Sequence, residues 1–203
     1  MFRPGESYMP KNIAPEEWKF IPSLKGKHAT RHIFILETLM SKGPKSYCDM
    51  ALEYLQLEPK FSTLNKANQY YRQRSENSTF YKRCRFLEEK DYVKKFGSLY
   101  KLSPKGAFLV LAVNPKILGS ASRDFLDDTN DLQKPEWLSG VNEEDTIKSF
   151  QDGFKSNPIG ADVLSFAARK ILLAYKINLD EISSKDLFSL LYEKTAAKLR
   201  KPS

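Results

Sequence analysis

The residue pair Gly97-Ser98 separates two short runs of β-forming residues, and this feature most constrains the fold. The runs are YVKKF before the pair and LYKL after it. A two-residue link that begins with glycine is typical of a type II′ turn, which joins two antiparallel strands. The sequence therefore predicts a β-hairpin over residues 92–102. The lysines expected close to its tip are Lys94, Lys95 and Lys101.

Before the hairpin, apolar residues recur at helical spacing in four segments. These segments span residues 29–40, 46–57, 63–74 and 78–90. Gly43-Pro44 ends the first, Ser46 fits the N-cap of the second, and Ser78 or Asn77 fits the N-cap of the last. In the last segment one face is apolar, formed by Phe80, Cys84 and Leu87. The opposite face carries Ser78, Lys82, Arg85 and Glu89, and we expect Phe86 to be exposed near it.

After the hairpin, Ser103 and Pro104 predict the start of another helix, because serine caps helices and proline is favoured at the first helical position. Apolar residues continue this helix over residues 107–113. Residues 114–142 are polar, acidic and rich in turn-forming residues, so we interpret them as a linker. Helical segments are then predicted at residues 143–154, 160–175 and 184–201. The middle one is apolar around most of its circumference, which predicts burial in a bundle or against a second chain.

The composition is typical of a soluble globular protein, with 41% hydrophobic and 29% charged residues. The longest dense apolar run, residues 107–113, is far shorter than the roughly 18 residues that a membrane-spanning helix needs. The N-terminus lacks the apolar region of a secretory signal. Four prolines in residues 1–26 predict an extended N-terminal arm. We therefore expect a cytoplasmic protein without a membrane partner.

Two cysteines and two histidines offer little for catalysis or metal binding. We expect Cys48 and Cys84 to be buried small apolar residues. His28 and His32 have the i, i+4 spacing that could share a metal, but no further ligand stands at a recognisable spacing. We interpret them as surface residues at a helix start. Common nucleotide-binding and hydrolase motifs do not occur, so the sequence predicts no enzyme, no metal and no cofactor.

The positive charge is concentrated in the first half of the chain. The net charge is +8, yet residues 1–113 hold 20 Lys and Arg against 11 Asp and Glu, whereas residues 114–203 hold 13 against 14. Residues 60–105 alone carry 12 basic and 4 acidic side chains. This asymmetry favours a polyanionic partner, with nucleic acid first and an anionic membrane surface second. An unevenly charged surface without a partner is the alternative.

The order of these elements resembles the winged helix-turn-helix domain of MarR-like and PadR-like transcription regulators. The resemblance covers residues 27–113 and is carried by the stretches GPKSYCDMALEYL, FYKRCRFLEEKDYV and YKLSPKG. It implies that the helix over residues 78–90 enters a DNA major groove while the hairpin, as the wing, contacts the backbone or the minor groove. One departure is the separation of some 20 residues between Leu57 and Ser78, where a short turn is usual. Either the segment 63–74 is an insert, or the helix that precedes the reading helix is misassigned.

The candidate DNA-binding residues are basic and hydroxyl side chains, which can contact phosphates or base edges. In the reading helix they are Ser78, Thr79, Tyr81, Lys82 and Arg85. In the wing they are Lys94, Lys95 and Lys101. In the segment 63–74 they are Lys66, Arg72 and Arg74, although this segment could equally be a solvated helix. The predicted helices and hairpin together indicate a mainly α fold with a small β-hairpin. In this fold a winged-helix domain is followed by a C-terminal helical region.

We expect this protein to bind double-stranded DNA, by sequence or by structure, and to regulate transcription in association with the nucleoid. Residues 143–203 would join two copies into a homodimer or bind a partner, so that two reading helices face a pseudo-palindromic site. The alternative function is a winged-helix adaptor that contacts another protein through an exposed Phe86. RNA binding ranks third, because the paired aromatic motifs of sheet-based RNA-binding modules are missing.

Overall fold

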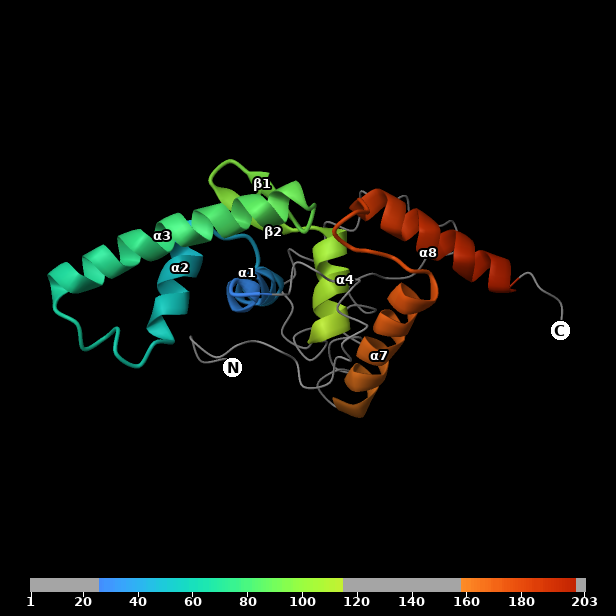
Figure 1. The fold of residues 1–203 in the computed structure, drawn as a ribbon, viewed down its shortest axis with the longest axis horizontal. Helices are drawn as coiled ribbons and strands as arrows, with labels where there is room; N and C mark the ends of the chain where they lie inside the picture. Colours follow the sequence, from blue (N-terminus) through green and yellow to red (C-terminus); the bar gives the residue numbers. More distant parts are fainter. Residues whose placement is uncertain (1–25, 115–157, 200–203) are drawn as a thin grey trace, which may run out of the picture.

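The computed structural model describes residues 26–114 and 158–199, which form a mainly helical fold with a two-stranded antiparallel hairpin (Figure 1). The elements before the hairpin are α1 (Ala29–Lys42), α2 (Tyr47–Gln56) and α3 (Lys66–Glu89). The hairpin consists of β1 (Val93–Phe96) and β2 (Leu99–Leu102). The elements after it are α4 (Pro104–Val113), α7 (Pro158–Ala174) and α8 (Ser184–Leu199). The predicted N-terminal arm, the linker beyond residue 114 and the predicted helix 143–154 lie outside the described residues.

Short polar side chains begin three of the helices, as N-caps do. The Oγ of Ser46 accepts a hydrogen bond from the backbone N of Asp49 (3.1 Å), and the Oγ of Ser103 accepts one from Gly106 N (3.0 Å). Both caps confirm the sequence prediction. The third cap is Asn65, whose Oδ1 accepts from Asn68 N (2.9 Å) at the start of α3.

The largest difference from the sequence prediction is α3, a single helix of 24 residues where two helices, 63–74 and 78–90, are predicted. Neither Asn77 nor Ser78 caps a helix; both lie inside α3. The polar stretch between the two predicted helices lacks apolar periodicity, but it also contains no proline or glycine to interrupt a helix. At this point α3 is held by Glu76, whose carboxylate pairs with the Arg31 guanidinium of α1 (2.5 Å).

The hairpin lies at its predicted position. Its register pairs Val93 with Leu102 and Phe96 with Leu99. Gly97 has φ +59°, whereas Ser98 is not among the residues with positive φ, which agrees with a type II′ turn. The opposite edge of β2 pairs with one residue of the α1–α2 connection: Tyr100 N donates to Lys45 O (2.8 Å).

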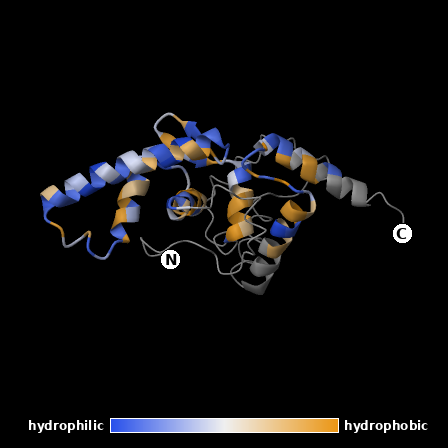
Figure 2. Ribbon diagram, in the orientation of Figure 1, coloured by the Kyte–Doolittle hydropathy of each residue, from blue (hydrophilic) through white to orange (hydrophobic). Residues whose placement is uncertain are grey.

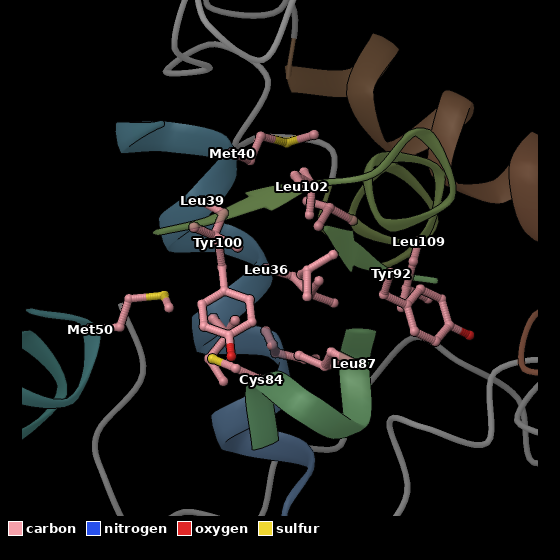
Figure 3. Close-up of a cluster of buried hydrophobic side chains, with 14 of the residues drawn as sticks. Leu36, Leu39, Met40, Met50, Cys84, Leu87, Tyr92, Tyr100, Leu102 and Leu109 are labelled. Carbon is pink, nitrogen blue, oxygen red and sulfur yellow. The ribbon is translucent and has the colours of Figure 1, made fainter. Parts of the chain in front are cut away.

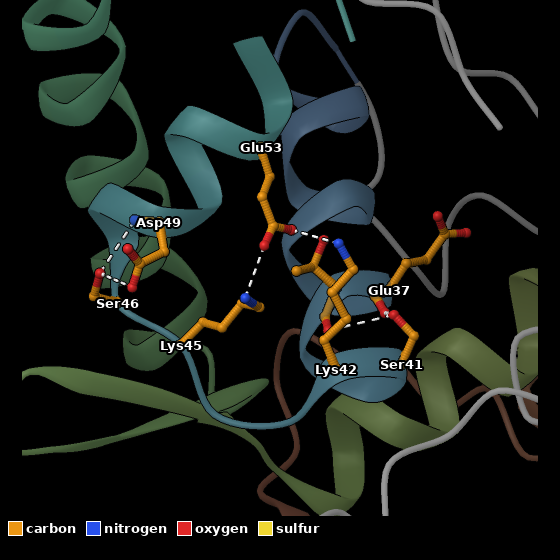
Figure 4. Close-up of polar contacts among 8 residues, drawn as sticks. Glu37, Ser41, Lys42, Lys45, Ser46, Asp49 and Glu53 are labelled. Carbon is orange, nitrogen blue, oxygen red and sulfur yellow. Dashed lines mark hydrogen bonds and ion pairs between the residues drawn. The ribbon is translucent and has the colours of Figure 1, made fainter. Parts of the chain in front are cut away.

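The α1–α2 connection is further fixed by Glu53 of α2 (Figure 4). Its carboxylate oxygens lie 2.8 Å from Lys42 Nζ and 2.7 Å from Lys45 Nζ. Burial acts to raise the pKa of Glu53, but the hydrogen bonds from the two lysines outweigh it and lower the pKa below its ordinary value. These lysines are therefore engaged within the fold.

The hydrophobic core lies between α1, the C-terminal part of α3, the hairpin and α4 (Figure 3). Leu36, Leu87 and Tyr100 are at most 1% exposed there. Leu172 of α7 and Leu187 of α8 are buried in the same cluster. The C-terminal helices therefore share a core with the elements before residue 114, and α7 packs against α4.

Polar contacts connect the base of the hairpin with residues 180–184, and we call them the hairpin-base network. Tyr92 Oη donates to Asp180 Oδ1 (2.6 Å), and Ser184 N donates to Asp91 Oδ2 (2.6 Å). Lys105 Nζ donates to the carbonyl of Ile182 (2.7 Å) and lies 4.4 Å from the centre of the Tyr92 ring. Burial lowers the pKa of Lys105. The network fixes the position from which the hairpin projects.

Candidate nucleic-acid interface

The unbroken α3 brings residues from both predicted helices onto one face. We call this face the α3 outer stripe, which consists of Tyr71, Arg74, Ser78, Lys82 and Arg85, all exposed. These residues follow one another at spacings of three or four, the spacing at which helical side chains are neighbours. At 1.5 Å per residue the stripe is about 21 Å long. It is therefore longer than the major groove is wide, which is about 12 Å.

The opposite face of α3 fixes the orientation of this stripe. Phe80, Cys84 and Leu87 are fully buried, as the apolar spacing predicts. The Phe80 ring packs against the rings of Phe34 (6.1 Å between centres) and Tyr54 (5.4 Å). Because these contacts prevent rotation of the helix, the basic residues of the outer stripe are held toward solvent.

Arg85 is supported on the helix surface by two neighbours. Hydrogen bonding to Tyr81 raises the pKa of Arg85, and Glu89 lies 3.7 Å away at i, i+4. Tyr81 is itself held by an edge-to-face contact with the Tyr47 ring (5.4 Å) and remains 39% exposed. Both side chains of this pair are exposed and the pair contributes little to stability, so a phosphate can replace Glu89 as the partner of Arg85.

Besides Tyr81, three predicted contact residues of α3 lie outside the outer stripe. Thr79 is half-buried, and its hydroxyl donates to the carbonyl of Ser75 (3.2 Å). Arg72 pairs with Glu58 of the α2–α3 connection (2.7 Å). Lys66 is exposed at the first turn of the helix. The α3 surface is therefore assembled mainly from residues 71–85 rather than from the helix start.

The hairpin presents a second surface beside α3, against which β1 packs. Lys94 and Lys101 are direct cross-strand partners, so their side chains lie on the same face. The next pair on this face is Phe96 and Leu99, which are 59% and 41% exposed. We call these four residues the wing face. Lys95, also exposed, pairs with the buried Tyr100 on the other face.

The sequence reasoning did not single out Phe96 and Leu99, although the signal was present. Side chains of a strand alternate between faces, and a two-residue turn fixes the register. Once Gly97-Ser98 is placed in the turn, Phe96 must share a face with the opposed lysines. The wing face could therefore have been derived from the predicted hairpin.

The predicted exposure of three side chains is wrong. Phe86 is half-buried, packs on the core and stacks on His32 of α1 with ring centres 5.0 Å apart and an interplanar angle of 7°. His32 is only 3% exposed, so it is a packed residue rather than a surface residue. Helical spacing places Phe86 at the edge of the outer face, but it gives no information about α1, which covers that edge. Cys48 is half-buried rather than buried.

The described residues form no cluster that indicates a metal site, and comparisons with known proteins do not identify another functional site. Within residues 26–114 and 158–199, His, Cys, Asp and Glu side chains do not gather in threes that could hold a metal ion. Each described helix is too short or too polar to cross a membrane. No protein-family model, curated protein or solved structure matches this chain. A functional assignment therefore depends on the surfaces of α3 and the hairpin.

Proposed function

We propose that this protein binds double-stranded DNA through a winged-helix domain and regulates transcription. The observation that carries the proposal is the α3 outer stripe, whose basic residues are held outward by buried contacts on the opposite face, beside a lysine-bearing hairpin. Polyanion binding also accounts for the location of the net positive charge within residues 60–105.

The arrangement of the elements supports the winged-helix part of the proposal. Two helices precede α3, the hairpin follows it, and the bridge from Lys45 to Tyr100 adds a third extended segment to the edge of β2. Because α3 begins at Lys66, only nine residues, 57–65, connect it to α2. The separation of some 20 residues that the sequence suggested is thereby much reduced, although the connection is still longer than the usual short turn.

In this function, α3 lies in the major groove with its outer stripe toward the DNA. Lys82 and Arg85 then reach guanine edges or phosphates, and Ser78 bonds a phosphate oxygen. Lys94 and Lys101 of the wing face neutralise phosphates beside the groove. Each neutralised phosphate releases a counterion, so the affinity should fall steeply as salt increases.

The test is a salt titration of binding to a labelled duplex of mixed sequence, measured by fluorescence anisotropy. If both residues contact phosphates, the plot of log binding constant against log salt concentration should be less steep by about 2 for the double variant Lys82→Ala/Arg85→Ala. Binding should also weaken about 10- to 100-fold at about 50 mM salt. The matched control is Lys170→Ala/Lys185→Ala, which removes two exposed charges from α7 and α8. Unchanged affinity of the first variant would show that the α3 outer stripe is not the binding surface.

The adaptor alternative loses its proposed contact, because Phe86 is packed against the core and His32. Homodimerisation through the C-terminal helices remains a proposal, for which α7 offers the exposed ring of Phe166 (53% exposed). The solution mass of the full chain from light scattering, with and without Phe166→Glu, tests it. A dimer that persists in this variant would place the contact elsewhere.

A further inference from the structure

The tip of the hairpin exposes two large apolar side chains side by side. Phe96 and Leu99 directly flank the Gly97-Ser98 turn and are 59% and 41% exposed. A cross-strand apolar pair stabilises a hairpin only slightly, which accounts for the pairing of the two side chains but not for their exposure. Because the turn contains only Gly97 and Ser98, no longer loop extends past these two side chains. The two side chains therefore form the apolar end of a narrow projection.

The residues behind this apolar end indicate the chemistry of its partner. Lys94 and Lys101 are opposed on the same face, where like charges repel each other, and Lys95 is exposed beside them. Neither strand contains an acidic residue. A polyanion could bind these lysines and cover the apolar pair at the same time. The partner is therefore expected to combine closely spaced negative charges with an apolar layer beneath them.

Duplex DNA has this combination, since its phosphates border stacked bases. Proteins that bend DNA from the minor groove insert apolar wedges, often Phe or Leu, between base steps and flank them with basic residues. An anionic membrane offers similar chemistry, but β1 of the hairpin packs against α3, whose outer stripe exposes Arg74, Lys82 and Arg85. The neighbouring stripe thus favours DNA over a lipid surface.

We propose that Phe96 and Leu99 insert as a wedge between base pairs of the bound duplex and bend it, an inference that rests on the proposed DNA binding. The hairpin is suited to this role because the hairpin-base network holds it: Tyr92 bonds Asp180, and Asp91 bonds Ser184. A projection that is fixed at its base resists being pushed back when it enters the base stack. Lys94 and Lys101 hold the phosphates on either side of the opened step.

The test is energy transfer between dyes at the two ends of a duplex of about 30 base pairs with a central TA step, which is easily unstacked. The wild-type protein should increase the transfer, because a wedge bends DNA by about 20–90°. Phe96→Ala/Leu99→Ala should lose most of this increase but keep the salt dependence of binding, because the lysines remain. Lys170→Ala/Lys185→Ala, which changes two exposed side chains of α7 and α8, should leave both unchanged. Circular dichroism should show the same helix content for each variant.

Three outcomes would overturn the inference. If the wild type binds the duplex without bending it, or if the double variant bends it fully, the wedge is wrong while DNA binding stands. If the wild type binds no duplex at about 50 mM salt, the proposed function fails as well. In that case, binding to vesicles rich in phosphatidylserine that is lost in Phe96→Ala/Leu99→Ala would assign the tip to a membrane surface.

Discussion

The two halves of α3 belong to one helix but are stabilised in different ways. In the C-terminal half, residues 76–89, the inward stripe is buried and consists of Glu76 followed by the apolar side chains of Phe80, Cys84 and Leu87. In the N-terminal half, residues 66–75, the same stripe continues as Gln69 and Gln73, while Tyr70 and Tyr71 are 61% and 68% exposed. Figure 1 shows this half extending beyond α1 and the hairpin, and Figure 2 shows its hydrophilic character. The difference teaches that tertiary packing holds one half of the helix and local contacts hold the other.

The local contacts of the N-terminal half come from the α2–α3 connection. Gln69 Nε2 donates to the carbonyl of Phe61 (3.2 Å), and Arg72 pairs with Glu58. Ten residues are too few for a stable isolated helix, because starting a helix is costly. Continuity with the packed half removes this cost, since the helix is already nucleated there. The half that carries Tyr71 and Arg74 is therefore helical without a core of its own.

The largest expected effect separates the halves by truncating one aromatic ring in each. Phe80→Ala should lower the free energy of unfolding by about 3–5 kcal/mol, because it leaves a cavity among Phe34, Tyr54 and α3. Tyr71→Ala should change the unfolding free energy by about 0.5 kcal/mol or less, because the ring is mostly exposed. Urea denaturation followed by circular dichroism measures both. Equal losses would mean that the two halves are packed alike.

Thiol reactivity provides a second comparison between the halves. Burial raises the pKa of Cys84 to about 12, from an ordinary value of 9.0. At neutral pH the thiolate fraction of Cys84 should therefore be on the order of 1000-fold smaller than that of an ordinary cysteine. A cysteine placed by Ser75→Cys in the exposed N-terminal half lacks this burial. Iodoacetamide labelling followed by mass spectrometry should modify residue 75 rapidly and Cys84 very slowly. Comparable rates would show that the packed half opens as readily as the exposed half.

The smallest expected effects come from the ion pair that each half makes. Glu76 is 2% exposed, and its hydrogen bond raises the pKa of Arg31. Glu76→Gln would leave the partly buried guanidinium of Arg31 without its carboxylate. We therefore expect it to lower the free energy of unfolding by about 1–3 kcal/mol. Glu58→Gln removes the more exposed pair with Arg72 and should cost about 1 kcal/mol or less. Urea denaturation at low and high salt tests this order. Only the Glu58 effect should weaken substantially as salt increases, and the reverse result would contradict the assignment.

The features that sequence reasoning predicted well are specified by neighbouring residues. Gly97-Ser98 fixes the hairpin, and Ser103-Pro104 fixes the start of α4 through local backbone preferences. The two described C-terminal helices were also placed within two residues of their observed ends. In each case the chemistry of a few adjacent residues is sufficient.

The features that it missed depend on residues distant in sequence. The continuity of α3 past Ser75 is supported by Arg31, 45 residues from Glu76, so apolar spacing within the helix could not reveal it. The stacking of Phe86 on His32 likewise depends on how α1 and α3 meet. At the candidate site, the outward direction of Lys82 and Arg85 was predictable from helical spacing. Their alignment with Tyr71 and Arg74 was not, because it requires one unbroken helix.

The hairpin-base network also decides where this chain can be divided. A fragment that ended at residue 114 would contain every element from α1 to α4, yet Tyr92 Oη and Lys105 Nζ would lose the oxygen atoms that accept their hydrogen bonds. It would also expose the apolar surface now covered by Leu172 and Leu187. A deletion intended to isolate the hairpin and α3 must therefore retain the segment that carries Leu172, Asp180, Ile182 and Leu187.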